Sequence, residues 1–306
     1  MSFSSDIKTE LCQDIPKSIH CRIAELAGII SVNGRVEEYE NDKRLIIRAE
    51  NETLEDLVRT LLSILFKASQ DKVLLVSEKM HHRKLVISHK DLMDEIYLKL
   101  KLNDDGSRIR VDKMVTERSC CKKLYLRGAF IAGGYMGSPE KNYQLELSLL
   151  SQQEAERISD ILLKEGLESR ISKRRDRFVL YVKDGDTISA LLGLLGAGNA
   201  MMEFENIRIL KDIRNVVNRE VNCDTANMAK TASAAAKHIE DIKYIRDNIG
   251  LDYLSDVLRE TASLRLEYPM HSIKELGELF NPPVGKSGIN HRLRKISSIA
   301  DELRNK

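Results

Sequence analysis

A chain of 306 residues with 42 % hydrophobic content is long enough to fold as an ordinary globular protein of two or three domains. Its longest apolar runs are far shorter than a membrane span, and the charged residues Asp6, Lys8 and Glu10 argue against a signal peptide. We therefore expect a cytoplasmic protein without membrane contact. The net charge of +2 is too small to indicate a partner, so only local charge clusters are informative.

In the first third of the chain, apolar periodicity predicts a helix over about residues 20–32, followed by the strands RVEEY and RLIIRAE with the turn residues Asn41 and Asp42 between them. A helix capped by Thr53 comes next, then the strands VLLVSE and KLVISH and the helix DLMDEIYLKL. The order is αββαββα. The apolar stripe of the helix after Thr53 comprises Leu54, Leu57, Val58, Leu61, Leu62 and Leu65.

The same order returns after the polar stretch NDDGSR, which we interpret as a linker. The helix KKLYLRGAFIAGG leads into strands ending in YQLELSLL, a helix with a capping box from Ser151 to Glu154, the strands SRISK and RFVLYV, and the helix DTISALLGLL. Gly28 and Gly128 occupy equivalent places 100 residues apart. An internal duplication explains this best.

The two lead helices carry small residues four positions apart, Ala24 with Gly28 and Gly128 with Ala132. Such pairs share one helical face and would let the two backbones approach closely across a pseudo-two-fold axis. Alternatively, they are small core residues in separate helices. The doubled order of elements favours the packed pair.

From Asn222 the pattern becomes helical, with a long segment ending at Gly250 that we interpret as a linker. The next helix, LDYLSDVLRETASLRLE, should bury one apolar face. A further helix begins at a capping box from Ser272 to Glu275, and after NPPVG we expect Ser287 to cap the last helix. The residues expected to face inward in these three helices are Leu254, Val257, Leu258 and Ala262; Ile273, Leu276, Leu279 and Phe280; and Ile289, Leu293 and Ile296.

The last two helices have the layout of a helix-turn-helix, which inserts its second helix into the major groove of DNA. Asn and Arg there can read adenine and guanine, while Lys and Ser hold phosphates. A three-helix tail that binds protein, basic only for solubility, is the alternative. The candidate DNA-binding residues are Ser272, Lys274, Lys286, Ser287, Asn290, His291, Arg292, Arg294 and Lys295.

A second basic cluster lies in ESRISKRRDRF, where a solvated surface is the ordinary interpretation and a secondary DNA contact the functional one. Its cations are Arg170, Lys173, Arg174, Arg175 and Arg177.

No metal site, cofactor or small-molecule ligand is predicted, because the chain lacks C-x-x-C pairs and its histidines, among them His20, His89, His238, His271 and His291, show no ligand spacing. His81 and His82 are adjacent and would point in opposite directions on a strand. We expect the cysteines to be reduced and mostly in the core: Cys12, Cys21, Cys120, Cys121 and Cys223.

The segment LAGIISVNG, from Leu26, is similar to the LAGLIDADG signature of homing endonucleases. More specifically, RGAFIAGGYMGSPEKNYQLEL, FENIRILKDIRNVVNREVNCDTANMAKT and SIKELGELFNPPVGKSGINHRLRKI resemble the WhiA family of bacterial regulators, nearly end to end. The resemblance implies an α+β fold: two LAGLIDADG-like halves at 1–104 and 105–220, a helical linker at 221–250 and a helix-turn-helix domain at 251–306.

Homing endonucleases hold divalent metal with a carboxylate from each motif. In the first copy, Ser31 and Asn33 stand at the two aspartate positions of the motif. In the second copy, Ile131 and Gly133 stand there. Neither copy supplies its carboxylate, so we expect no catalytic residues and no enzyme activity. Asn33 and Gly34 are better explained as a left-handed helix cap and turn.

We therefore expect a regulator that binds double-stranded DNA in a sequence-specific way, with transcription machinery or other regulators as further partners. The resemblance implies roles in sporulation gene control, cell division, the cell cycle and chromosome segregation, at the nucleoid. A division-site or nucleoid adaptor that binds DNA loosely is the alternative. The stretch NREVNCDTANMAKT has no chemical explanation, and Asn222 or Asp224 could simply cap the long helix.

Overall fold

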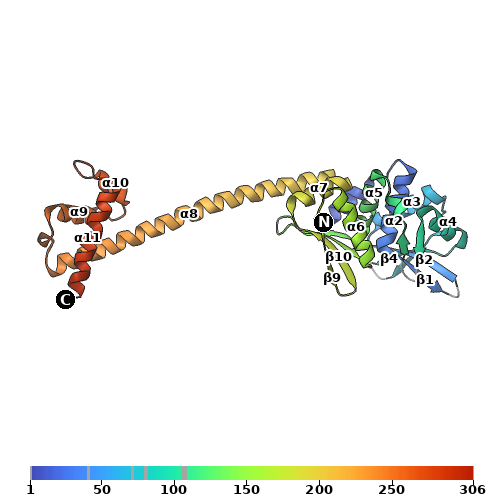
Figure 1. The fold of residues 1–306 in the computed structure, drawn as a ribbon, viewed down its shortest axis with the longest axis horizontal. Helices are drawn as coiled ribbons and strands as arrows, with labels where there is room; N and C mark the ends of the chain where they lie inside the picture. Colours follow the sequence, from blue (N-terminus) through green and yellow to red (C-terminus); the bar gives the residue numbers. More distant parts are fainter. Residues whose placement is uncertain (1, 40–41, 70–71, 79–81, 105–108, 306) are drawn as a thin grey trace. The chain divides into compact units, whose positions relative to one another are not determined.

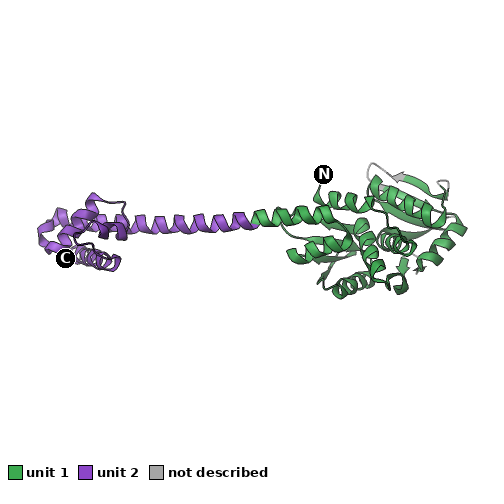
Figure 2. Cartoon of the chain, turned by 90° about the horizontal axis from the view of Figure 1, so that it is seen from above, with its two compact units in different colours: residues 1–211 green, residues 212–306 purple. Residues whose placement is uncertain are grey.

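The computed structural model describes residues 2–39, 42–69, 72–78, 82–104 and 109–305. The chain divides into two compact units, residues 1–211 and 212–306 (Figure 2). Each unit has its own hydrophobic core. Three sequence predictions fall outside the described residues: the turn residue Asn41, the histidine His81 that precedes His82, and most of the linker NDDGSR.

Unit 1 contains the predicted duplication. Its first half runs α2 (Ile19–Asn33), β1 (Gly34–Tyr39), β2 (Asp42–Ala49), α3 (Glu52–Phe66), β3 (Leu74–Glu78), β4 (His82–Ile87) and α4 (Lys90–Leu100). The second half runs α5 (Ser119–Gly133), β7 (Gly134–Met136), β8 (Leu145–Leu149), α6 (Gln152–Lys164), β9 (Arg170–Arg174), β10 (Arg177–Val182) and α7 (Gly185–Leu195). Both halves have the order αββαββα, and the α+β fold class is confirmed.

The two four-stranded antiparallel sheets share one topology, β1-β2-β4-β3 and β7-β8-β10-β9. In Figure 1 the labelled strands of unit 1 lie along one side, and α3, α5 and α7 lie along the other. Strand β8 shows how the sequence sets this layering: Leu145, Leu147 and Leu149 are buried, while Glu146 and Ser148 between them are partly exposed. Because every second side chain points to the same side, one face of the sheet packs against the core and the other is available for contacts.

Helices α2 and α5 pack against each other at the centre of unit 1, as their small residues predicted. A Cβ added to Gly28 would lie 2.3 Å from the carbonyl oxygen of Tyr125, and one added to Gly128 would lie 2.1 Å from that of Glu25. No Cβ tolerates such distances. Both glycines are therefore required by the close backbone approach, and Ala24 and Ala132 are fully buried beside them.

A buried ion pair lies next to this helix pair. Arg127 of α5 places Nε 2.8 Å from Oε1 of Glu25 on α2, and both side chains are almost completely buried. Arg127 also donates to the carbonyl oxygens of Leu11 and Asp14 and, at 3.1 Å, to the Asp14 carboxylate. Those acceptors lie on and just after α1 (Phe3–Gln13), a helix that the sequence analysis did not predict and whose Ile7 and Leu11 complete the core.

Three local expectations for unit 1 were wrong. Helix α3 is capped by Asn51, whose side chain accepts from the amide of Leu54 at 2.9 Å, and not by Thr53. Its predicted apolar stripe is nevertheless buried throughout. The capping box of α6 is only half formed. The Ser151 hydroxyl accepts from the amide of Glu154, but the Glu154 carboxylate accepts from the Tyr125 hydroxyl and does not return to Ser151. The segment around NDDGSR, interpreted as a linker, carries two short strands, β5 (Leu102–Asp104) and β6 (Ile109–Val111). The 3-10 helix η2 (Lys113–Thr116) follows them.

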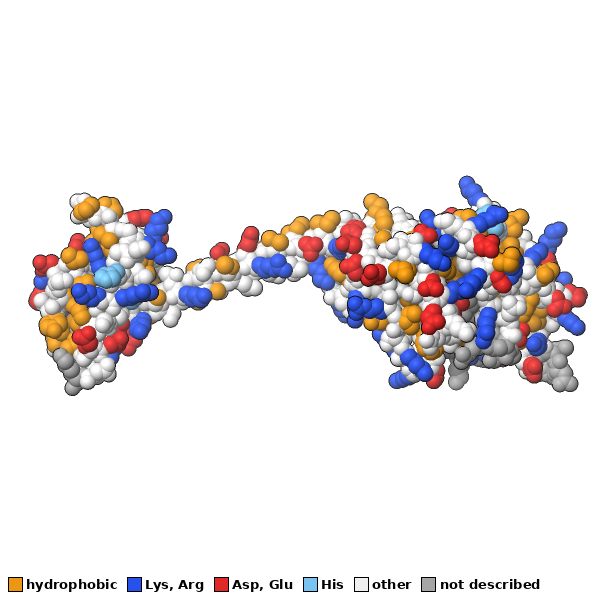
Figure 3. All heavy atoms as spheres, in the orientation of Figure 1, with side chains coloured by type: hydrophobic (Ala, Val, Ile, Leu, Met, Phe, Trp, Pro, Cys, Tyr) orange, Lys and Arg blue, Asp and Glu red, His pale blue; other side chains and the backbone are white. Residues whose placement is uncertain are grey.

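Helix α8 (Gly198–Asn248) begins in unit 1 and ends in unit 2. Phe204, near its start, belongs to the first core, and Ile242 and Ile245, near its end, belong to the second. The helical stretch predicted from Asn222 therefore starts 24 residues earlier, and neither Asn222 nor Asp224 caps it, because both lie inside it. Apolar side chains are exposed along its middle (Figure 3): Ile209, Leu210, Ile213, Val216, Val217, Val221 and Met228.

Unit 2 continues with η3 (Leu251–Tyr253), α9 (Asp256–Glu267), α10 (Ile273–Glu278) and α11 (Lys286–Arg304). The capping box from Ser272 to Glu275 is confirmed, whereas α11 is capped by Gly285, and Ser287 is already in its first turn. Val257 and Leu279, expected inside, are 48 % and 41 % exposed. Among the described residues, every helix is too short or too polar to span a lipid bilayer.

Candidate nucleic-acid interface

The C-terminal ends of α2 and α5 carry Asn33 and Gly133, the positions where metal-binding carboxylates would stand. The Asn33 side chain donates through Nδ2 to the carbonyl oxygens of Ala132, at 2.9 Å, and Arg48, at 3.1 Å. It therefore bridges the two halves through amide hydrogen bonds. The expected left-handed cap is wrong, because Asn33 is the last residue of α2 and Gly34 is extended, with φ −81° and ψ 141°. Glycine is needed at position 34 for space, since a Cβ would lie 2.4 Å from the carbonyl oxygen of Ile30.

Around these two residues lies a pocket of about 380 Å³, and four of its ten lining residues are cations. Arg48, Arg83, Lys84 and Arg177 contribute to its wall, from strands β2, β4 and β10 of both sheets. Its one lining carboxylate, Glu50, is ion-paired with Lys8 at 2.8 Å. Arg83 is itself ion-paired with Glu52 and, at 2.9 Å, with Glu55. The other three cations still outnumber the single lining carboxylate, so the pocket suits an anion such as a phosphate better than a divalent metal.

Arg35 on β1 adds one further cation close to Arg48 and Arg177. The pKa of Arg35 is lowered, first by partial burial and then by the nearby charges of Arg48 and Arg177. An anion bound between these side chains would relieve their mutual repulsion. The geometry therefore favours contact with a polyanion on the sheet side of unit 1.

The basic hairpin β9–β10 borders the second sheet, with Arg177 opposite Arg174 in register. Four of its five predicted cations, Arg170, Lys173, Arg174 and Arg175, are exposed. Arg174 forms an ion pair with Glu146 at 2.8 Å, and Arg177 is half-buried and donates to Ser148 Oγ at 3.2 Å. The hairpin tip thus offers several exposed cations, whereas Arg177 belongs with the pocket beside Asn33.

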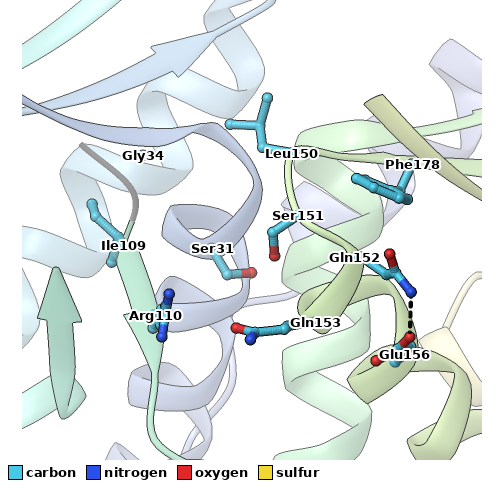
Figure 4. Close-up of a pocket in the computed structure, with 10 residues that line it drawn as sticks. All are labelled: Ser31, Gly34, Ile109, Arg110, Leu150, Ser151, Gln152, Gln153, Glu156 and Phe178. Atoms are coloured by element: carbon cyan, nitrogen blue, oxygen red, sulfur yellow. Dashed lines mark hydrogen bonds between the residues drawn. The ribbon is translucent and has the colours of Figure 1, made fainter. Parts of the chain in front are cut away.

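A second pocket of about 440 Å³ lies where α2, β6 and the start of α6 meet (Figure 4). Ser31, the other degenerate motif position, faces it but donates its hydroxyl to the carbonyl oxygen of Gly28 at 2.8 Å. Across the pocket, Gln152 donates to Glu156 at 2.8 Å. Among the described lining residues Glu156 is the one carboxylate, so the paired acids of a nuclease metal site are not assembled here either.

In unit 2, α11 presents the predicted recognition surface. Ile289, Leu293 and Ile296 are buried against α9 and α10, so the opposite face of α11 is solvent-exposed. Five candidate residues are exposed and Asn290 is partly exposed. The exposed candidates on this helix are Lys286, Ser287, His291, Arg294 and Lys295.

Three other candidates are already engaged within unit 2. The Arg292 guanidinium lies 5.0 Å from the centre of the Phe280 ring, a cation–π contact that holds it against the helix pair. Ser272 accepts from the amide of Glu275 as a helix cap, and the exposed Lys274 lies 4.0 Å from Glu278. Ser272 therefore has the capping role that the sequence predicted, whereas the contact of Arg292 with Phe280 was not anticipated.

The sequence analysis missed one group of candidate metal-binding side chains. His20, Cys21, Cys120 and Cys121 come together at the opposite ends of α2 and α5 from Asn33, although no local ligand spacing marks them. The 100-residue offset between Gly28 and Gly128 is the signal that could have found them, because it also makes positions 20 and 120, and 21 and 121, equivalent. Three of the five cysteines are buried, as expected of most of them, and Cys120 and Cys223 are exposed.

Comparisons with known proteins match both units. Residues 122–214 match the WhiA LAGLIDADG-like domain, and residues 217–300 match the WhiA C-terminal HTH domain. The chain is 39 % identical over 312 residues to the "Probable cell division protein WhiA" of Lachnoclostridium phytofermentans, covering 99 % of this chain and 100 % of that one. It is 40 % identical over 318 residues to the protein of that name in Clostridium beijerinckii, covering 99 % of both chains.

The solved structure of full-length DUF199/WhiA from Thermatoga maritima matches with a TM-score of 0.61 at 24 % identity, covering 99 % of both chains. That similarity supports the fold of two LAGLIDADG-like halves followed by a helix-turn-helix region. Taken with the domain matches and the end-to-end relatives, it leads to one conclusion: the chain belongs to the WhiA family.

Proposed function

We propose that this protein is a sequence-specific DNA-binding regulator that acts in cell division at the nucleoid, without nuclease activity. One observation carries the proposal: α11, in a domain matched as a helix-turn-helix, turns its apolar residues into the core and exposes Lys286, His291, Arg294 and Lys295. The names of the relatives support the link to cell division. Sporulation control and chromosome segregation are further roles that the same DNA-binding activity would serve.

The sheet side of unit 1 is proposed as a second DNA contact. Its support is the cationic pocket beside Asn33 and the exposed hairpin cations Arg170, Lys173, Arg174 and Arg175. Cations on such a surface neutralise phosphates and strengthen binding to all sequences alike. Discrimination between sequences is assigned to α11.

Footprinting of the purified chain on genomic fragments tests the regulator proposal. Discrete protected sites are expected. Uniform, salt-sensitive retention without protected sites would contradict it and favour an adaptor that binds DNA loosely.

Variants then assign the roles of single side chains. Asn290→Ala should weaken binding to a protected site by about 1–3 kcal/mol while leaving scrambled duplex nearly unaffected, because the amide would bond to a base edge and not to a phosphate. Lys295→Ala, or Lys173→Ala in the hairpin, should weaken both duplexes and flatten the salt dependence by about 0.9 for each phosphate that is no longer neutralised. If Asn290→Ala weakens both duplexes equally, α11 does not carry the selectivity.

The absence of nuclease activity is proposed from the donor set at the degenerate site. An amide engaged with two carbonyl oxygens and a glycine cannot hold a catalytic cation, and the surrounding charge is positive. Supercoiled plasmid carrying a protected site should therefore stay intact with magnesium or manganese. Site-specific nicking that a chelator abolishes would contradict this.

A further inference from the structure

Four side chains with metal-binding atoms meet where α2 and α5 begin. His20 and Cys21 are the second and third residues of α2, and Cys120 and Cys121 are the second and third residues of α5. Their four ligand atoms all lie within 4.8 Å of one another. The pseudo-two-fold axis explains the meeting, because the close approach of Gly28 and Gly128 brings the equivalent ends of both helices together.

The distances from His20 to the three sulfur atoms are close to those of a tetrahedral zinc centre. Nδ1 of His20 lies 3.3 Å from Sγ of Cys121, 3.4 Å from Sγ of Cys21 and 3.9 Å from Sγ of Cys120. With zinc–nitrogen bonds of about 2.0–2.1 Å and zinc–sulfur bonds of about 2.3 Å, tetrahedral geometry places such nitrogen and sulfur atoms about 3.5 Å apart. The three observed distances lie on both sides of this value.

The closeness of the sulfur atoms favours a bound cation. All four ligand atoms lie within 4.8 Å of one another, so three thiolates there would repel each other unless a divalent cation supplied the countercharge. All three cysteines also lie in the first turn of a 15-residue helix, where the helix dipole favours anionic sulfur.

We propose that His20, Cys21, Cys120 and Cys121 bind one zinc ion through one imidazole nitrogen and three thiolates, clamping the start of α2 to the start of α5. Three cysteines and one histidine form a closed structural zinc set, because no position remains open for water. On coordination each thiol loses its proton to solvent while neutral imidazole donates its lone pair, so zinc uptake releases up to three protons.

This site is separate from the degenerate nuclease position. Asn33 lies 13 residues along α2 from His20, which corresponds to about 20 Å at 1.5 Å per residue. The donors also differ: sulfur and imidazole select zinc, whereas a nuclease cation needs carboxylate oxygens. Zinc would therefore have a structural role here, holding together the two halves that the duplication created.

Zinc content tests the proposal directly. The full chain, purified with a non-thiol reductant and without chelator, should carry equimolar zinc by elemental mass spectrometry. Cys21→Ser and Cys121→Ser should each lose most of it, because three ligands hold zinc much more weakly than four. Cys223→Ser is the matched control, since Cys223 is an exposed cysteine on α8 outside the cluster. Equal zinc in all of these variants would place the metal elsewhere and overturn the assignment.

Two measurements on the unaltered chain keep the proposal testable if those variants fail to fold. Cobalt added to metal-free protein should saturate at one equivalent and give the intense bands of a tetrahedral thiolate complex. Zinc should protect Cys21, Cys120 and Cys121 from alkylation while Cys223 reacts in either case. Reduced protein that binds neither metal, or fresh protein in which two of the three cluster cysteines form a disulfide, would overturn the proposal.

Discussion

Glu25 links the protonation of one residue to the stability of unit 1. Burial raises the pKa of its carboxyl from 4.5 to about 7, an effect that the Arg127 charge opposes and the Asp14 charge reinforces. The folded state therefore binds the proton more tightly than the unfolded state. The contribution of Glu25 to the free energy of unfolding is therefore fully present below about pH 4.5, where the carboxyl is protonated, and is lost as the pH rises through about 7.

Glu25→Gln should remove that contribution to the pH dependence. The midpoint of urea unfolding, followed from pH 4.5 to 7, should fall less steeply with rising pH in the variant than in the unaltered chain. Glu38→Gln, which removes an exposed carboxyl on β1, is the control for the loss of one charge. Identical slopes in Glu25→Gln and the unaltered chain would show that Glu25 does not change its protonation on folding in this range.

Individual residues also show where inference from sequence reaches its limit. The small residues Gly28 and Gly128 predicted the helix pair correctly, because four-residue spacing is local information. The prediction of Thr53 as the cap of α3 was wrong, since Asn51 two residues earlier can cap equally well and sequence locates helix ends only to within one or two residues. The role of Asn33 was beyond reach, because its acceptor on Ala132 lies 99 residues away.

Among the elements, the α2–α5 pair depends on its two glycines. Gly128→Ala would place a Cβ about 2.1 Å from the Glu25 carbonyl oxygen, so the helices must separate. We expect a loss of about 1–3 kcal/mol or more in the free energy of unfolding, measured by urea denaturation. Gly198→Ala at the start of α8 is the control, because no atom lies within 4 Å of the added Cβ there. Equal stability of the two variants would contradict the close-approach argument.

Element boundaries were predicted less well than element order. Both αββαββα halves were visible because long amphipathic helices and alternating strands carry a strong periodic signal. The start of helix α8 was predicted too late in the chain, because Gly198 looks like a helix breaker and the exposed apolar residues in the middle of the helix resemble a core face. The cluster of His20, Cys21, Cys120 and Cys121 could not be predicted from spacing, since packing alone joins its two halves.

For the whole molecule, the two separate cores predict independent stability. Leu293, fully buried in unit 2, has no place in the first core. Leu293→Ala should cost about 2–5 kcal/mol and abolish site-specific DNA binding by loosening unit 2. Hydrogen exchange should rise in α9, α10 and α11 and stay unchanged in α2 and α5. Glu302→Ala, at an exposed position of α11 outside the proposed DNA contact, controls for the substitution. Loss of protection in both units would refute independent cores.

The internal duplication also has a consequence for direction along DNA. A dimer of identical chains is unchanged by a half-turn, so it fits palindromic sites and cannot distinguish one end from the other. Here the two halves of unit 1 share a topology but not a sequence: Asn33 corresponds to Gly133, and Arg48 to Ser148. A surface that is only approximately symmetric binds an asymmetric target in one orientation. Each bound site would then have a defined orientation. Reversing a site relative to a promoter would present a different face of the protein to the next protein that binds there.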